Sequence, residues 1–143
     1  ALELFDLIAT VDRPSLADTL ERHLAPTGRR LPIMVEVNLG REVQKGGILE
    51  EELEPLLEHL FLRCPHLEPV GLLTIPPYHP DPEQSRPYFR RLGQLARTLA
   101  GRFGLASLQL SMGMSEDYWV AVEEGAHWVR LGRVLFGERQ QVR

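Results

Sequence analysis

Residues 110–139 read LSMGMSEDYWVAVEEGAHWVRLGRVLFGER, and this stretch decides the fold. An apolar run is followed by a turn of small residues, a helical segment, a second apolar run and a second glycine turn. Ser-Met-Gly-Met-Ser therefore follows one predicted strand directly, and Arg-Leu-Gly-Arg ends the next. Glycine lets the backbone approach a ligand closely because it carries no Cβ atom. The pattern predicts two consecutive strands whose ends form turns suited to ligand binding.

The rest of the chain shows the same alternation of apolar and amphipathic segments. Strands are expected over residues 4–13, 31–40, 67–77, 106–114 and 127–132. Amphipathic helices are expected between them, the second starting near Glu51 so that Pro55 lies close to its first turn. Asp12 or Ser15 is expected to cap the first helix and Ser115 the fourth. The predicted order is β-α-β-α-β-α-β-α-β.

Apolar strands that alternate with helices predict a parallel sheet covered by helices. Two architectures fit this pattern, an open doubly wound sheet and a (β/α)8 barrel. A Gly-x-Gly-x-x-Gly motif after the first strand is absent, which weakens a dinucleotide-binding sheet. Five strands are too few for a whole barrel, so a barrel would lack its first three βα units.

Composition limits the classes of function. The 143 residues suggest one domain, and the net charge of −4 gives no electrostatic case for nucleic acid or an anionic membrane. The apolar runs are too short to span a membrane, and no signal-peptide pattern is present. The lone Cys64 and the spacing of the five histidines predict no metal site. A reducing, cytoplasmic setting is expected.

Candidate binding residues follow the predicted strands, because ligands of parallel sheets and barrels meet the carboxyl ends of the strands. They are Asn38, Met114, Ser115, Arg130, Gly132 and Arg133, with Thr10, Asp12 and Thr74 at the other strand ends. Backbone N–H groups after Ser115, its hydroxyl and the glycine-arginine turn together favour an anion, most naturally phosphate. Simpler interpretations stay open at this point: Ser115 as a cap only, Arg130 as a surface ion-pair partner, and Asn38 as a turn residue.

The sequence of the chain resembles those of the pyridoxal-phosphate homeostasis proteins, which are small relatives of the alanine racemase N-terminal barrel. The family pattern L-S-M-G-M-S-x-D, A-x-x-x-G and V-R-[IVL]-G-x-x-[IL]-F-G fits Leu110–Asp117, Ala121–Gly125 and Val129–Gly137. TVDR at 10–13, VEVNLGREVQKGG at 35–47 and GLLTIP at 71–76 also occupy family positions. The resemblance covers the whole chain in order.

The resemblance implies an α/β fold, a (β/α)8 TIM-type barrel of which residues 1–143 supply the C-terminal part, about strands four to eight, of a single domain. It implies pyridoxal 5'-phosphate (PLP) as cofactor, with phosphate contacts at Met114, Ser115, Gly132 and Arg133. Arg130 matches the arginine that faces the pyridine nitrogen. An arginine at that position keeps the pyridine nitrogen unprotonated. An unprotonated pyridine is a poor electron sink, which favours holding the cofactor over catalysis. No catalytic residue is therefore expected, and PLP-dependent apoenzymes are the expected recipients.

The sequence departs from the family in two places. Position 133 is commonly Thr or Ser in the family and is Arg here, and the family's Schiff-base lysine on the first barrel strand has no counterpart in this chain. Lys45, the only lysine, matches a different lysine in the loop after the fifth barrel strand. A fragment is the expected explanation, and its exposed strand edges would favour self-association or pairing with the missing part.

Two other functions remain open from the sequence alone. A fold-type-III PLP enzyme such as an amino-acid racemase would need a second catalytic residue, typically a tyrosine from another domain. The tyrosines at 78, 88 and 118 have no racemase-like context. An unrelated barrel that binds a phosphorylated metabolite would explain the anion site but not the long motif.

Overall fold

The computed structural model describes residues 2 and 4–137, which form a single five-stranded sheet with every neighbouring pair parallel. The strands are β1 (Ile8–Val11), β2 (Leu31–Glu36), β3 (Leu67–Leu73), β4 (Gln109–Met114) and β5 (Trp128–Arg130). The helices are α1 (Pro14–Leu24), α2 (Glu50–Arg63), α3 (Arg86–Arg102), α4 (Tyr118–Glu123) and α5 (Arg133–Phe136), with 3-10 turns η1 (Ala25–Thr27) and η2 (Pro82–Ser85).

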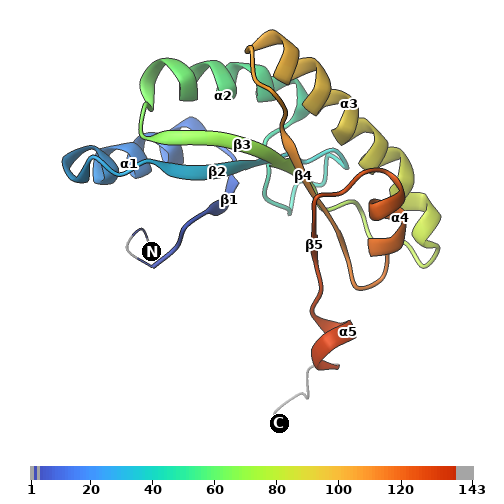
Figure 1. The fold of residues 1–143 in the computed structure, drawn as a ribbon. Coiled ribbons are helices and arrows are strands. Elements are labelled where there is room, and N and C mark those ends of the chain that lie inside the picture. Colours follow the sequence, from blue (N-terminus) through green and yellow to red (C-terminus); the bar gives the residue numbers. More distant parts are fainter. Residues whose placement is uncertain (1, 3, 138–143) are drawn as a thin grey trace.

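The order of the strands decides between the two architectures. Strands that follow one another in the chain are neighbours in the sheet, in the order β1-β2-β3-β4-β5. A doubly wound sheet reverses its strand order part-way, whereas a barrel adds strands in sequence. Figure 1 shows the sheet curving beneath α2 and α3. The arrangement is a partial (β/α) barrel, as predicted.

Alternating side chains of the strands build the core on the side that the helices cover. In β2, Ile33 and Val35 are fully buried in the main apolar cluster. Met34 and Glu36 point to the opposite, inner face, because successive side chains of a strand alternate. Leu57 of α2 and Phe89 of α3 close the core from the outside. One face of the sheet is therefore packed by helices, while the inner face carries polar groups.

Several predicted boundaries differ from the structure. The first strand covers Ile8–Val11 rather than 4–13, because it is an edge strand that pairs only with β2. Neither Asp12 nor Ser15 caps α1: the N-cap is Arg13, without a side-chain hydrogen bond. The Asp12 carboxylate instead accepts a hydrogen bond from the backbone N–H of Gly47 at 3.2 Å. The Asp12 carboxylate, one of the two predicted caps of α1, thus binds the backbone of a distant loop instead.

The turn after β4 depends on Gly113, the middle residue of Ser-Met-Gly-Met-Ser. Its φ of +96° lies in the left-handed region, which residues with a Cβ rarely adopt. A Cβ at this position would lie 2.6 Å from the Cβ of Ala121 and 3.1 Å from the Cα of Tyr118. Gly113 therefore allows α4 to pack directly against the end of β4.

Replacing Gly113 with alanine should destabilise the fold by at least about 2 kcal/mol, because backbone strain and overlap with α4 act together. Chemical denaturation of the two proteins measures the difference. The matched control is Gly101→Ala in α3, where nothing lies within 4 Å of the added Cβ and helix propensity favours alanine. Equal stabilities of the two variants would refute the role given to Gly113.

Candidate functional site

The turns after β4 and β5 meet through the hydroxyl of Ser115. Its Oγ accepts hydrogen bonds from the backbone N–H groups of Gly132 at 3.3 Å and Val134 at 3.2 Å. The predicted cap of α4 is thus wrong, because α4 begins only at Tyr118 after Asp117. Ser115 instead gathers N–H donors that follow the neighbouring strand. The predicted convergence of the two turns is observed.

A pocket of about 460 Å³ opens where the turns after β4 and β5 meet. It is separate from a pocket of about 580 Å³ at the amino ends of β3 and β4. Four predicted residues line the pocket of about 460 Å³, namely Met114, Ser115, Gly132 and Arg133, together with Phe136 and Gly137. Among the described residues, nothing lies within 4 Å of a Cβ built on Gly132, so the backbone there is open to a ligand. Its lining offers backbone N–H groups, a hydroxyl and a guanidinium. These are donors that bind phosphate.

Arg133 is the charged member of this pocket. Its guanidinium makes an ion pair with Glu116 at 2.5 Å, and both side chains are about half exposed. Exposed ion pairs contribute little to stability, so this contact leaves Arg133 free to exchange partners at small cost. The arginine at the position where the resemblance expects a hydroxyl therefore still supplies a donor to the pocket.

Asp117 fixes the shape of the turn that carries Ser115. One carboxylate oxygen accepts a hydrogen bond from the backbone N–H of Met114 at 2.8 Å, and the other accepts one from the hydroxyl of Ser85 at 2.8 Å. Ser85 belongs to η2, so the carboxylate links the segments that follow β3 and β4. This role was not predicted, although Asp117 is the last residue of the family motif at Leu110–Asp117.

Asp117→Ala removes both acceptors and should lower the free energy of unfolding by about 1–3 kcal/mol, since the part-buried Ser85 hydroxyl and the exposed Met114 N–H lose their partner. Asp117→Asn is the matched variant, because its amide oxygen still accepts from Met114. Thermal or denaturant unfolding should rank wild type above Asp117→Asn, and Asp117→Asn above Asp117→Ala. Two variants of equal stability would show that the hydrogen bonds do not matter.

Arg130 lies on the inner face of the sheet, two residues before the glycine turn. Its guanidinium donates to the Ser111 hydroxyl at 2.8 Å and to the Thr74 carbonyl at 3.2 Å, so it spans the ends of three strands. Burial lowers the pKa of Arg130, while the nearby carboxylates of Glu36 and Asp117 act in the opposite direction. An arginine remains protonated despite such a shift. Arg130 is therefore a fixed cation on the inner face and not a surface ion-pair partner.

The inner face also carries the carboxylate of Glu36. Burial raises its pKa above the ordinary value, the neighbouring Asp12 raises it further, and Arg130 lowers it. A carboxyl group whose pKa is raised in the folded state stabilises the fold fully below its ordinary pKa of 4.5, and this contribution is lost as the pH rises through the raised value. The inner face thus favours a protonated Glu36.

The pH dependence of stability should change in Glu36→Gln. Because the glutamine cannot ionise, the variant should gain stability relative to wild type as the pH rises from 4.5 through the raised pKa. Denaturant unfolding across this range, in phosphate-free buffer, measures the difference. Glu68→Gln, at an exposed position of β3, is the control and should run parallel to wild type. A parallel Glu36→Gln curve would refute the burial argument.

The loop after β2 places Asn38 differently from the other predicted residues. Its side chain donates to the Glu42 carbonyl at 2.8 Å and accepts from the Glu42 N–H at 3.1 Å, which closes the loop. Lys45, from the same loop, pairs with Glu42 at 2.6 Å and donates to the Pro76 carbonyl at 3.1 Å. Lys45 and Arg133 share a smaller pocket of about 190 Å³. Asn38 therefore shapes a neighbouring loop rather than lining the phosphate-type pocket.

Comparison with known proteins places the chain in a family. The sequence profile of the family described as "Alanine racemase, N-terminal domain" matches residues 1–140.

The chain belongs to the alanine racemase N-terminal domain family. It is 45% identical over 134 residues to the pyridoxal phosphate homeostasis protein of Aquifex aeolicus, covering 94% of this chain and 58% of that protein. The human protein of the same name is 38% identical over 138 residues, which are 93% of this chain and 50% of that protein. The chain thus spans about half the length of the curated relatives it matches, and the predicted resemblance is confirmed.

Solved structures agree with the observed fold. PipY of Synechococcus elongatus with PLP bound matches with a TM-score of 0.85 and 33% identity, over 96% of this chain and 63% of that chain. Alanine racemase of Corynebacterium glutamicum matches with a TM-score of 0.66 at 20% identity, over 95% of this chain and 37% of that chain, which shows the fold alone.

Among residues 2 and 4–137, none of the helices has the length and apolar character needed to cross a membrane.

Proposed function

We propose that this chain binds PLP and takes part in intracellular vitamin B6 homeostasis, holding the cofactor and delivering it without catalysis. The observation that carries the proposal is the pocket at the ends of two adjacent strands, where the Ser115 hydroxyl lies beside the Arg133 guanidinium and accepts from the Gly132 and Val134 N–H groups, which a bound phosphate could take over. The bound PLP in the similar PipY structure and the names of the curated relatives support it.

The proposed cofactor-binding residues are Met114, Ser115, Gly132 and Arg133 around the phosphate, Arg130 on the inner face, and Asn38 through the loop that it closes. Residues 1–143 are proposed to form the C-terminal part of a single (β/α)8 barrel, supplying strands four to eight. The in-order parallel sheet with two unpaired edges among the described residues supports this assignment.

The non-catalytic role rests on Arg130. The PLP ring can act as an electron sink when its pyridine nitrogen is protonated, which is the chemistry that PLP enzymes use. The guanidinium of Arg130 is held by Ser111 and Thr74 and offers N–H donors rather than a carboxylate. With PLP bound as the resemblance implies, Arg130 would face that nitrogen, and a permanent donor there would disfavour its protonation. We therefore assign cofactor storage and transfer, with PLP-dependent apoenzymes as recipients and the cytoplasm as the location.

Arg133→Ala should weaken PLP binding by about tenfold or more, because a hydrogen bond to a charged group contributes about 1.5–3 kcal/mol. Equilibrium titration of PLP, followed by absorbance and by thermal shift, measures the change. The matched control is Arg97→Ala, which removes the same charge from an exposed position of α3. Equal PLP affinities for the two variants would contradict the placement of the phosphate in this pocket.

Absence of catalysis has its own test. Amino acids incubated in D2O with PLP and this protein should exchange their Cα hydrogen no faster than with PLP alone, because the pyridine nitrogen is not activated. Proton NMR of alanine and of larger amino acids follows the exchange. Exchange that is accelerated by wild type and abolished in Arg133→Ala would establish a racemase-type activity in place of the proposed role.

A further inference from the structure

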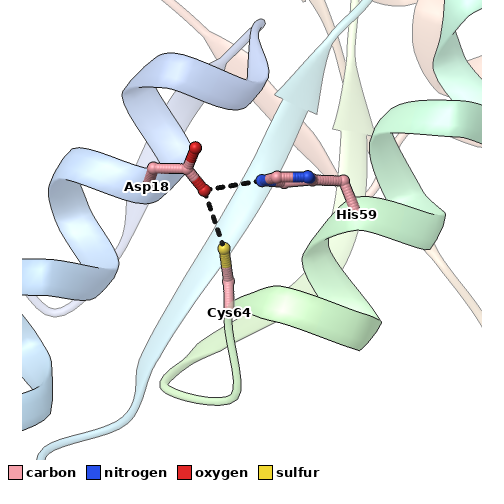
Figure 2. A group of neighbouring side chains, drawn as sticks. All are labelled: Asp18, His59 and Cys64. Carbon is pink, nitrogen blue, oxygen red and sulfur yellow. Dashed lines mark hydrogen bonds and ion pairs between the residues drawn. The ribbon is translucent and has the colours of Figure 1, made fainter.

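A second group of polar side chains lies between α1 and α2, away from the strand ends that form the proposed PLP site. Asp18 comes from α1, His59 from α2, and Cys64 from the residue that ends α2 (Figure 2). Cys64 lies three residues before β3, whereas the PLP site lies beyond the carboxyl ends of the strands. The seven residues of β3 span roughly 20 Å, so the two places are at opposite ends of the sheet.

The three side chains converge on one point. The Nε2 atom of His59 lies 2.6 Å from Oδ1 of Asp18, and the Cys64 sulfur lies 3.9 Å from the same oxygen. One donor atom from each residue falls within 4.8 Å of the other two. Around a tetrahedral Zn²⁺ ion with bonds of about 2.0–2.3 Å, neighbouring donor atoms are about 3.3–3.7 Å apart. Small side-chain rotations therefore bring all three donors to bonding distance.

The three side chains differ in their exposure to solvent, and this difference suits an open metal site. Cys64 is fully buried, the His59 side chain is 26% exposed and the Asp18 side chain is 49% exposed. The thiol is thus held by the protein, and the carboxylate faces solvent. An ion entering from the Asp18 side would keep one position for water, as three-ligand zinc sites do.

The charges around the thiol also favour a cation. The carboxylates of Asp18 and Glu21 both lie close to the Cys64 thiol, and an Asp18 oxygen is 3.9 Å from its sulfur. The titratable groups around the thiol are these two carboxylates, the imidazoles of His59 and His66, and the guanidinium of Arg30, which lines the same pocket as Cys64. Glu21 is already engaged, since it accepts from the His66 backbone N–H at 3.0 Å and contacts its Nδ1 at 2.6 Å. It therefore contributes negative charge beside the group without serving as a ligand.

We propose that Asp18, His59 and Cys64 bind one divalent transition-metal ion, Zn²⁺ by preference, with water as the fourth ligand. Oxygen, nitrogen and sulfur donors together suit Zn²⁺ and Co²⁺ rather than Mg²⁺ or Ca²⁺, which take oxygen ligands. Binding replaces the thiol proton, which is released to solvent. The proton on Nε2 of neutral His59 moves to Nδ1, so that one proton leaves for each ion bound. The ion joins α1 to α2.

This proposal departs from the prediction, made from the sequence, that the chain has no metal site. His59 lies 41 positions and Cys64 46 positions from Asp18 along the chain, and the pattern of neither helix suggests a shared ligand set. The packing of α1 against α2 brings them together. The site does not depend on the proposed PLP function.

Titration of the metal-free protein with Co²⁺ tests the proposal. One equivalent should produce a thiolate-to-cobalt charge-transfer band in the near ultraviolet with the visible bands of a tetrahedral ion, and Zn²⁺ should abolish both. Cys64→Ser, His59→Gln and Asp18→Asn should each weaken Zn²⁺ binding by more than about tenfold, since loss of even an outer partner costs that much. His23→Gln, an exposed histidine at the end of α1, is the matched control and should bind as wild type does.

Thermal unfolding gives a second measure. Zn²⁺ should raise the unfolding temperature of wild type and of His23→Gln, and a chelator should reverse the increase. Absence of the charge-transfer band, or equal Zn²⁺ affinity in His59→Gln and His23→Gln, would overturn the proposal. If Cys64→Ser fails to fold, His59→Gln and Asp18→Asn decide the outcome, because both side chains are partly exposed.

Discussion

Parallel pairing between strands that follow one another in the chain is the constraint on which the site depends. It places the carboxyl ends of β1 to β5 along one edge, so that residues distant in sequence become neighbours. Ser115 then reaches Gly132 and Val134, and Arg130 reaches back to Ser111 and Thr74. Without the parallel pairing of the strands, these residues would not lie close together. The helices cover one face and leave the other for polar groups.

The carboxyl edge of the sheet is rich in hydrogen-bond donors. Backbone N–H groups, a hydroxyl and guanidinium groups converge there, whereas Glu36 on the inner face is disposed towards its neutral form. Such donors suit the binding of an anion. The names of the curated relatives support the proposal that this anion is the phosphate group of PLP.

Local sequence patterns predicted the strands, the helices and the parallel sheet, because apolar periodicity reports burial directly. They also predicted that Ser115, Gly132 and Arg133 would meet, since the carboxyl ends of parallel strands share an edge. Hydrogen-bond partners were not predictable. Ser115 looked like a helix cap, yet its hydroxyl accepts from the following turn, and Asp12 accepts from Gly47, 35 positions away. Asp18, His59 and Cys64 meet only through helix packing, which no local pattern encodes.

We propose that the phosphate group of PLP binds at the ends of β4 and β5. Thermal protection of the protein by three compounds, PLP, inorganic phosphate and pyridoxal without its phosphate, tests this most directly. We expect PLP to protect most, phosphate to protect measurably and compete with PLP, and pyridoxal to protect least. Equal protection by PLP and pyridoxal, with no effect of phosphate, would contradict it.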